Sequence, residues 1–175
     1  MLKMFTTQLI GLLKGIQERE DLAMEDAARL LSQALIGEGY VYLYGAGEMN
    51  AITSEALYGK ERLPKFLSLF DQDKMVDLNS TDRVLLLTRS SADKNVLAYA
   101  KEVALKQIPI VVISSIDEHD RELVDLADVH LDLNLTTSLV PTETGERVGY
   151  PASLAGLYVY FCLYLLINDF LEEYE

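Results

Sequence analysis

The sequence is poor in the residues that form disulfides and metal sites. It contains one cysteine, two histidines and no tryptophan among 175 residues. The single Cys162 excludes an intrachain disulfide, and because it lies in an apolar segment we interpret it as a small core residue. Neither His119 nor His130 belongs to a Cys/His cluster with metal-ligand spacing, and the acidic residues form no compact calcium loop. We therefore expect no metal site.

Basic residues and long apolar runs are also scarce. Against 28 acidic residues there are 15 lysines and arginines, which gives a net charge of −13. This charge repels nucleic acid and anionic membranes, so neither is an expected partner. The apolar run Leu154 to Ile167 has 14 residues, fewer than the roughly 20 that cross a bilayer. The N-terminus lacks the unbroken apolar block of a signal peptide. Together with the lone cysteine, these features favour a cytoplasmic protein.

The chain alternates between short apolar runs and segments of helical periodicity. This order predicts one domain over 1–175, a three-layer, doubly wound α/β fold around a parallel sheet of about five strands. An N-terminal helical extension, 1–37, is expected to hold a pair of helices at 2–17 and 20–36, before an α/β core at 38–175. In the core we expect strands at 40–44, 66–70, 83–88, 109–114 and 129–133, and helices at 49–59, 91–107, 118–127 and 152–173.

A glycine-rich turn follows the first predicted strand. Gly45, Gly47 and Asn50 form the pattern G-x-G-x-x-N, and the glycines allow a ligand to approach the backbone at a helix N-terminus. The third glycine of a dinucleotide-binding loop is missing, so a nucleotide cofactor is the weaker alternative and we expect no bound cofactor. The turn predicts a binding site for an anion.

A second turn, about forty residues later, carries hydroxyl groups. Thr88, Arg89, Ser90 and Ser91 follow a leucine-rich strand and precede a helix. Hydroxyls and helix-terminal amides bind phosphate, and Arg89 supplies a charge. The alternative is a helix cap, because Ser90 followed by Asp93 resembles a capping box. Asp93 also competes with a phosphate for the positive end of the helix dipole.

In combination, these turns make the chain resemble the sugar isomerase (SIS) domain family, in which a glycine loop and a serine-rich loop bind a phosphorylated sugar. The segments LADVHLDLN and GYPASLAGLYVYFCLYLLIND resemble that family's next strand and closing helix, and the latter contributes Ser153. Within the family, phosphoheptose isomerases and an uncharacterised group of standalone proteins from Gram-positive bacteria are most similar. The resemblance implies a sugar phosphate ligand and a homo-oligomer, a dimer or tetramer, whose sites commonly borrow residues from a neighbouring subunit.

The resemblance also identifies a candidate catalytic base. Glu55 matches the position of an essential glutamate in phosphoheptose isomerases, and Glu48 lies seven residues earlier, nearly two helical turns away. Aldose–ketose isomerisation requires one group that moves a proton between neighbouring carbons, as a carboxylate can. These isomerases also use a histidine from the last helix, which is absent from 152–173 here. The alternatives are a non-catalytic phosphosugar sensor, or a structural dimer in which both glutamates are solvated surface acids.

Thr, Gly and Pro are common in the stretch 134–151, the one long irregular segment. Loops of this length in compact domains are usually functional or mobile. We therefore expect this loop to contact the ligand.

Overall fold

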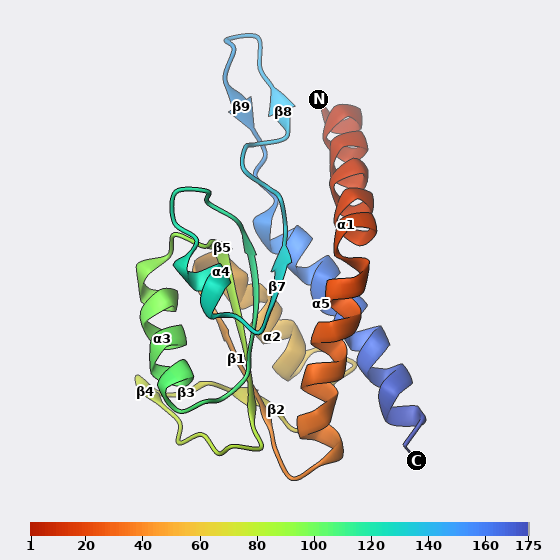
Figure 1. Ribbon diagram of the computed structural model, residues 1–175. Coiled ribbons are helices and arrows are strands. Elements are labelled where there is room, and N and C mark those ends of the chain that lie inside the picture. Colours follow the sequence, from red (N-terminus) through yellow and green to blue (C-terminus); the bar gives the residue numbers. More distant parts are fainter. Residues whose placement is uncertain (175) are drawn as a thin grey trace.

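A five-stranded parallel sheet forms the centre of the computed structural model, which describes residues 1–174 (Figure 1). The strand order is β2-β1-β5-β6-β7. The strands are β1 (Val41–Gly45), β2 (Phe66–Ser68), β5 (Arg83–Ser90), β6 (Ile110–Ser115) and β7 (Val129–Asp132). All six residues of β6 are buried, as expected for an apolar run in a parallel sheet that is covered on both faces. The predicted three-layer α/β fold is confirmed.

Helices cover both faces of the sheet. One layer contains α1 (Leu2–Ile36), α2 (Asn50–Tyr58) and α5 (Ala152–Glu172), and the other contains α3 (Lys94–Leu105) and α4 (Glu122–Leu126). The side chains of β5 alternate between these layers: Leu85 and Leu87 join the core of the first, while Val84 and Leu86 join the core of the second. The sheet thus divides the interior into two apolar cores.

The N-terminal segment differs from the predicted pair of helices. Residues 2–36 form one continuous helix, α1, of 35 residues. The expected break at 18–19 falls on Glu18 and Arg19, which favour helix, and Gly and Pro are absent there. The second half of α1 packs on the sheet through residues such as Ala27, Ala28 and Leu31, which are fully buried. The prediction of two helices was therefore wrong.

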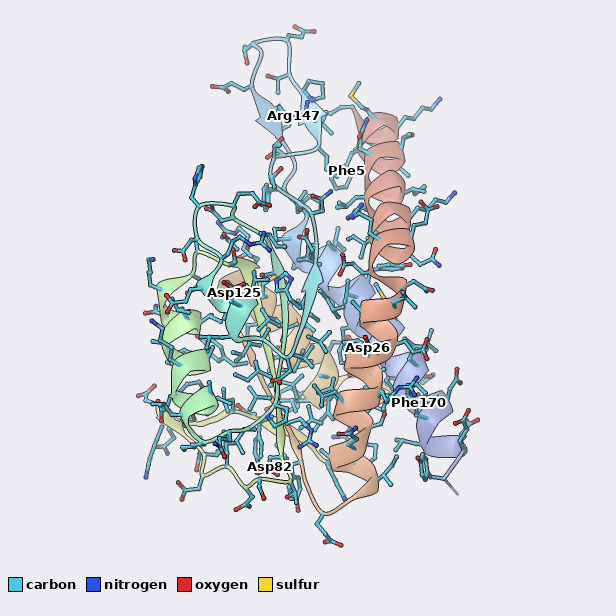
Figure 2. The ribbon with its side chains drawn as sticks, viewed as in Figure 1. Phe5, Asp26, Asp82, Asp125, Arg147 and Phe170 are labelled. Carbon is cyan, nitrogen blue, oxygen red and sulfur yellow. The ribbon has the colours of Figure 1, made fainter. Side chains whose placement is uncertain are left out.

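The first half of α1 extends beyond the sheet and lies beside a short hairpin. The hairpin strands are β8 (Val140–Pro141) and β9 (Arg147–Val148), within the stretch predicted to be irregular. Figure 2 labels Arg147 on this hairpin and Phe5 on the neighbouring end of α1. At the base of the hairpin, Gly149 has a φ of 78° and lies against the Phe5 ring.

Three other predicted boundaries needed correction. The expected helix 118–127 begins only at Glu122, because Asp117 and Asp120 close a tight turn before it. The expected helix 91–107 begins at Lys94. The expected strand 66–70 ends at Ser68, and a hairpin of β3 (Phe70–Asp71) and β4 (Lys74–Met75) follows.

Among the described residues, α5 is the one helix long and apolar enough to cross a membrane. A core helix of a soluble protein has the same composition, and α5 packs against α1 and α2. Its buried side chains include Val159, Tyr160 and Leu163. The fold therefore uses α5 as a packing helix.

Candidate functional site

The two predicted loops lie side by side at one edge of the sheet. The glycine loop follows β1 and the serine loop follows β5, and these strands are neighbours. Numbered along the chain, the sheet has the order 2-1-3-4-5, which reverses direction between these two strands. Open α/β sheets bind ligands beyond the carboxyl ends of their strands at this switch point. The topology therefore points to this edge as the candidate site.

Gly45 and Gly47 shape the first loop. A side chain on Gly45 would collide with the Met49 carbonyl oxygen, so only glycine lets the short 3-10 helix Gly47–Met49 pack on the end of β1. Gly47 has a φ of 55°, which glycine adopts without strain. Met49 is fully buried and Asn50 is exposed. The loop is thus fixed by backbone packing.

An ion pair joins the two loops. Arg89 donates from Nε to Glu48 Oε1 at 2.6 Å and from Nη2 to Glu48 Oε2 at 3.0 Å. These hydrogen bonds lower the pKa of Glu48 and raise the pKa of Arg89. Both side chains remain partly exposed, 38% for Glu48 and 59% for Arg89. Sequence reasoning named both residues but not their contact.

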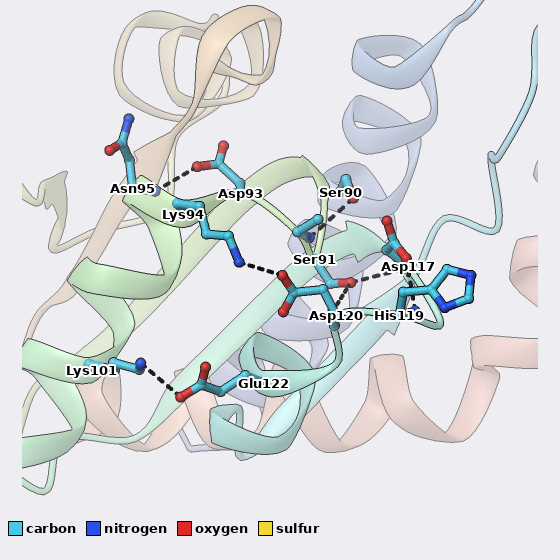
Figure 3. A network of polar contacts seen from close by, with 11 residues as sticks. Ser90, Ser91, Asp93, Lys94, Asn95, Lys101, Asp117, His119, Asp120 and Glu122 are labelled. Carbon is cyan, nitrogen blue, oxygen red and sulfur yellow. Dashed lines mark hydrogen bonds and ion pairs between the residues drawn. The ribbon is translucent and has the colours of Figure 1, made fainter.

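The hydroxyls of Thr88 and Ser91 are already occupied. Thr88, which is buried, donates to Asp93 Oδ2 at 2.9 Å. Ser91 is also buried, and its Oγ donates to the Asp120 carbonyl and accepts from the Asp117 amide, both at 2.8 Å (Figure 3). Ser91 therefore links the serine loop to the turn after β6.

The Ser90 hydroxyl, unlike those of Thr88 and Ser91, donates no hydrogen bond within the described residues. Its Oγ accepts a hydrogen bond from the Ala92 amide at 3.2 Å, which leaves the hydroxyl hydrogen available to a ligand (Figure 3). The cap of α3 is Asp93, whose Oδ1 accepts from the amides of Asn95 and Val96 at 3.0 and 3.1 Å. The capping alternative for Ser90 is corrected accordingly: Ser90 ends β5 and Asp93 caps the helix.

Two open hollows meet at Ser90. The first, of about 350 Å³, lies between the two loops, with Gly47, Glu48, Arg89 and Asp93 in its lining. The second, of about 300 Å³, lies beside the serine loop. Its lining contains four hydroxyl groups and two carboxylates, from Ser90, Ser115, Thr136, Tyr150, Asp117 and Glu118. The loop 134–151 supplies Thr136 and Tyr150. Ser115 and Asp117 were not predicted as site residues, because Ser115 ends an otherwise apolar strand and Asp117 follows it.

Five predicted site residues line neither hollow: Gly45, Asn50, Ser91, Ser153 and Glu55. Ser153, in the first turn of α5, lines neither of them. Glu55 lies further along α2, with its carboxylate beside Gly59 at the end of the helix. Burial, together with the negative charge of Glu55, raises the pKa of Tyr160. Glu48 and Glu55 thus do not meet within one chain.

The histidines and acidic groups provide no metal site among residues 1–174. His119 is exposed in the turn after β6. His130 lies on β7 with Nε2 at 2.7 Å from Ser114 Oγ, and burial lowers its pKa to about 4. Neither histidine lines the two hollows.

A larger hollow, of about 560 Å³, lies at the opposite edge of the sheet, with Lys60, Arg62 and Lys65 in its lining. Lys65 Nζ donates to the carbonyls of Leu35 and Gly37 at 3.1 and 2.7 Å. Arg62 donates to the Leu57 carbonyl at 3.4 Å. Lys65 thus neutralises the C-terminal end of α1, and Arg62 that of α2. Two of the three cations in this hollow are therefore already bound to backbone carbonyls.

Comparisons with known proteins agree with this fold. A family described as "Domain of unknown function (DUF2529)" matches residues 1–171. The uncharacterized protein YwjG of Bacillus subtilis is 37% identical over 174 residues, 99% of each chain. A phosphoheptose isomerase from Francisella tularensis superimposes with a TM-score of 0.67 at 17% identity, over 96% of this chain and 94% of the isomerase. The NanR protein of Vibrio vulnificus, complexed with ManNAc-6P, superimposes with a TM-score of 0.65 at 15% identity, over 99% of this chain and 63% of NanR.

Proposed function

The chain belongs to the DUF2529 family, and from its fold and its paired hollows we propose that it binds a phosphorylated sugar. The observation that carries this proposal is the position of Arg89 and Ser90, which stand at the sheet's switch point where the two hollows meet. A guanidinium and a hydroxyl are suitable donors for a phosphate. The similarity of the fold to a phosphoheptose isomerase and to a protein complexed with ManNAc-6P supports the same ligand class.

In this proposal the phosphate contacts Arg89 and Ser90. A guanidinium has five donors, and Glu48 takes two of them, so Arg89 binds phosphate without leaving Glu48. The sugar then lies in the second hollow, where Ser115, Thr136 and Asp117 offer hydrogen bonds to its hydroxyl groups. One small ligand thereby connects both hollows.

Binding without isomerisation is the better supported version of this function. The hydrogen bonds from Arg89 lower the pKa of Glu48, which makes this carboxylate a weaker base. Glu55 is directed toward the end of α2, outside both hollows. Aldose–ketose isomerisation of the phosphoheptose isomerase type is the second candidate, and Glu55 is then its base, at a site completed by another subunit.

We also propose that the protein is a cytoplasmic homo-oligomer. Leu154, Phe161 and Leu165 form an exposed apolar stripe on α5, with 48%, 40% and 62% of their surfaces exposed. The spacing of these residues, seven and four along the chain, places them on one face of the helix. Apolar side chains grouped in this way are typical of a surface that a partner covers.

Calorimetric titration of an Arg89→Ala variant tests the binding site. We expect affinity for sugar phosphates to fall by at least about tenfold, the cost of a lost hydrogen bond to a charged group. Lys101→Ala is the matched control, because Lys101 pairs with Glu122 on the surface of α3 and α4. Equal affinities for wild type and Arg89→Ala would contradict the proposal.

Exchange of the sugar's C2 proton with solvent deuterium tests catalysis separately. Binding without exchange supports a sensor or carrier role. Exchange that is lost in Glu55→Gln would instead establish isomerisation, because the amide keeps the shape of the side chain but cannot accept a proton.

A further inference from the structure

The Asp93 carboxylate occupies the position that an anion would take at the N-terminus of α3. Its Oδ1 accepts hydrogen bonds from the Asn95 and Val96 amides, and its Oδ2 accepts one from the Thr88 hydroxyl. These three donors surround one carboxylate, and Figure 3 shows Asp93 at the start of α3. Helix amides and a nearby hydroxyl are the groups that bind phosphate in many proteins. Here a side chain of the protein already satisfies them.

Charge in the hollow between the loops adds a second constraint. The ionic side chains in its lining are those of Glu48, Arg89 and Asp93, which sum to a charge of −1. Glu48 and Arg89 neutralise each other through their paired hydrogen bonds. Asp93 therefore leaves the hollow negative, in a chain whose net charge is −13. A phosphate held by Arg89 and Ser90 lies in the same hollow as this carboxylate.

We infer that Asp93 is a specificity-determining residue. Its carboxylate excludes phosphate from the N-terminus of α3 and lowers the affinity of the hollow for doubly charged ligands. This inference rests on the proposed function. A phosphate monoester carries a charge of about −1.5 to −2 at neutral pH, whereas a sulfate ester of the same sugar carries a single charge. Asp93 repels the phosphate more strongly. The wild-type site consequently gains little from the second charge of a phosphorylated sugar.

Asp93→Asn tests this inference without removing the cap. Asparagine caps helices as well as aspartate does. Its Oδ1 can accept from the same two amides, which keeps the cap, while its Nδ2 donates to the Thr88 hydroxyl oxygen, which reverses the direction of that hydrogen bond. The variant changes the charge and keeps the shape. Asp77→Asn makes the same change in charge at an exposed residue between β4 and β5, away from both hollows, and is the matched control.

The experiment compares glucose 6-phosphate with glucose 6-sulfate, by calorimetric titration at low and at high salt. We expect Asp93→Asn to bind the phosphate about tenfold more tightly than wild type at low salt, because one nearby repulsive charge is gone. The gain should shrink at high salt, where ions screen the charge. The affinity for sulfate should rise less, so the ratio of the two affinities increases. Asp77→Asn should match wild type.

Each outcome decides between the inference and the proposed function. Wild-type binding of phosphate with an unchanged phosphate-to-sulfate ratio in Asp93→Asn would overturn the role of Asp93 and leave the proposed function standing. Phosphate binding by Asp93→Asn alone would support the role of Asp93 and overturn the proposed function for the native protein. If neither protein binds either ester, both claims fail, because removing the repulsion has then opened no anion site.

Discussion

Asp82 is a buried carboxylate that connects the segments preceding β1 and β5. It is 1% exposed, and its two oxygens accept hydrogen bonds from the amides of Tyr40 and Asn79, at 2.9 and 2.7 Å. Asp82→Ala leaves both amides without a partner, and we expect a loss of about 2–4 kcal/mol in the free energy of unfolding. Urea denaturation measures this loss, and Asp73→Ala, at an exposed residue, is the control. Equal stability of the two variants would show that water replaces the carboxylate.

His130 should make stability depend on pH. Burial lowers its pKa from 6.5 to about 4 in the folded protein. The unfolded chain therefore binds the proton first as the pH falls, and stability is lost between these two values. We expect this residue alone to cost about 2 kcal/mol on going from about pH 7 to about pH 5. Denaturation of wild type and His130→Gln at both values measures the difference. An identical pH dependence in the two proteins would contradict this account.

At the scale of residues, the sequence identified the loops better than the roles within them. Ser90 and Ser91 look equivalent in the sequence, yet Ser91 is fully buried and bonded to residues 26 and 29 positions away. Local pattern carries no information on such contacts. For the same reason, the ion pair between Glu48 and Arg89, which are 41 positions apart, could not be predicted from the sequence.

At the scale of elements, replacing Gly45 or Gly11 with alanine should change stability in opposite directions. A side chain on Gly45 collides with the Met49 carbonyl, while nothing lies within 4 Å of the corresponding position at Gly11. Gly45→Ala should therefore disrupt the turn from β1 into α2, at a cost of at least about 2 kcal/mol. Gly11→Ala, in the exposed part of α1, should raise helix stability by about 0.5–1 kcal/mol. Thermal and urea unfolding measure the stability of both variants. A stable Gly45→Ala or a destabilised Gly11→Ala would contradict the prediction.

The elements themselves were largely predictable, and their ends were not. Strands β5 and β6 are apolar runs that only a sheet covered on both faces accommodates. The start of α3 depends on the side chain of Asp93, which captures the amides of Asn95 and Val96. The sequence around Glu18 contains no Gly or Pro that would end a helix. Local propensity favours continuation there, and the structure continues.

At the scale of the whole molecule, the apolar stripe on α5 predicts self-association. Leu165, with 62% of its surface exposed, is the most exposed residue of this stripe. Leu165→Glu should convert the proposed oligomer into a monomer, because a charge cannot be buried without a partner. Light scattering gives the mass. Leu105→Glu is the control, since Leu105 is 86% exposed at the end of α3, in the other layer. A wild-type monomer at micromolar concentration would contradict the prediction.

The order of strands is a property of the whole chain. Alternating strands and helices predict a parallel sheet, but they do not determine that β1 lies between β2 and β5. This order creates the switch point and brings together loops that are about forty residues apart. The proposed site therefore follows from long-range topology, which the local sequence patterns leave open.

A titration followed by two-dimensional amide NMR tests the central claim most directly. The account predicts that a sugar phosphate shifts the amide signals of Gly47, Arg89, Ser90 and Thr136, which belong to the two hollows at the switch point. The unphosphorylated sugar should shift them far less. Shifts confined to the opposite edge of the sheet, around Lys60 and Arg62, or no shifts with pentose, hexose and heptose phosphates, would contradict the claim.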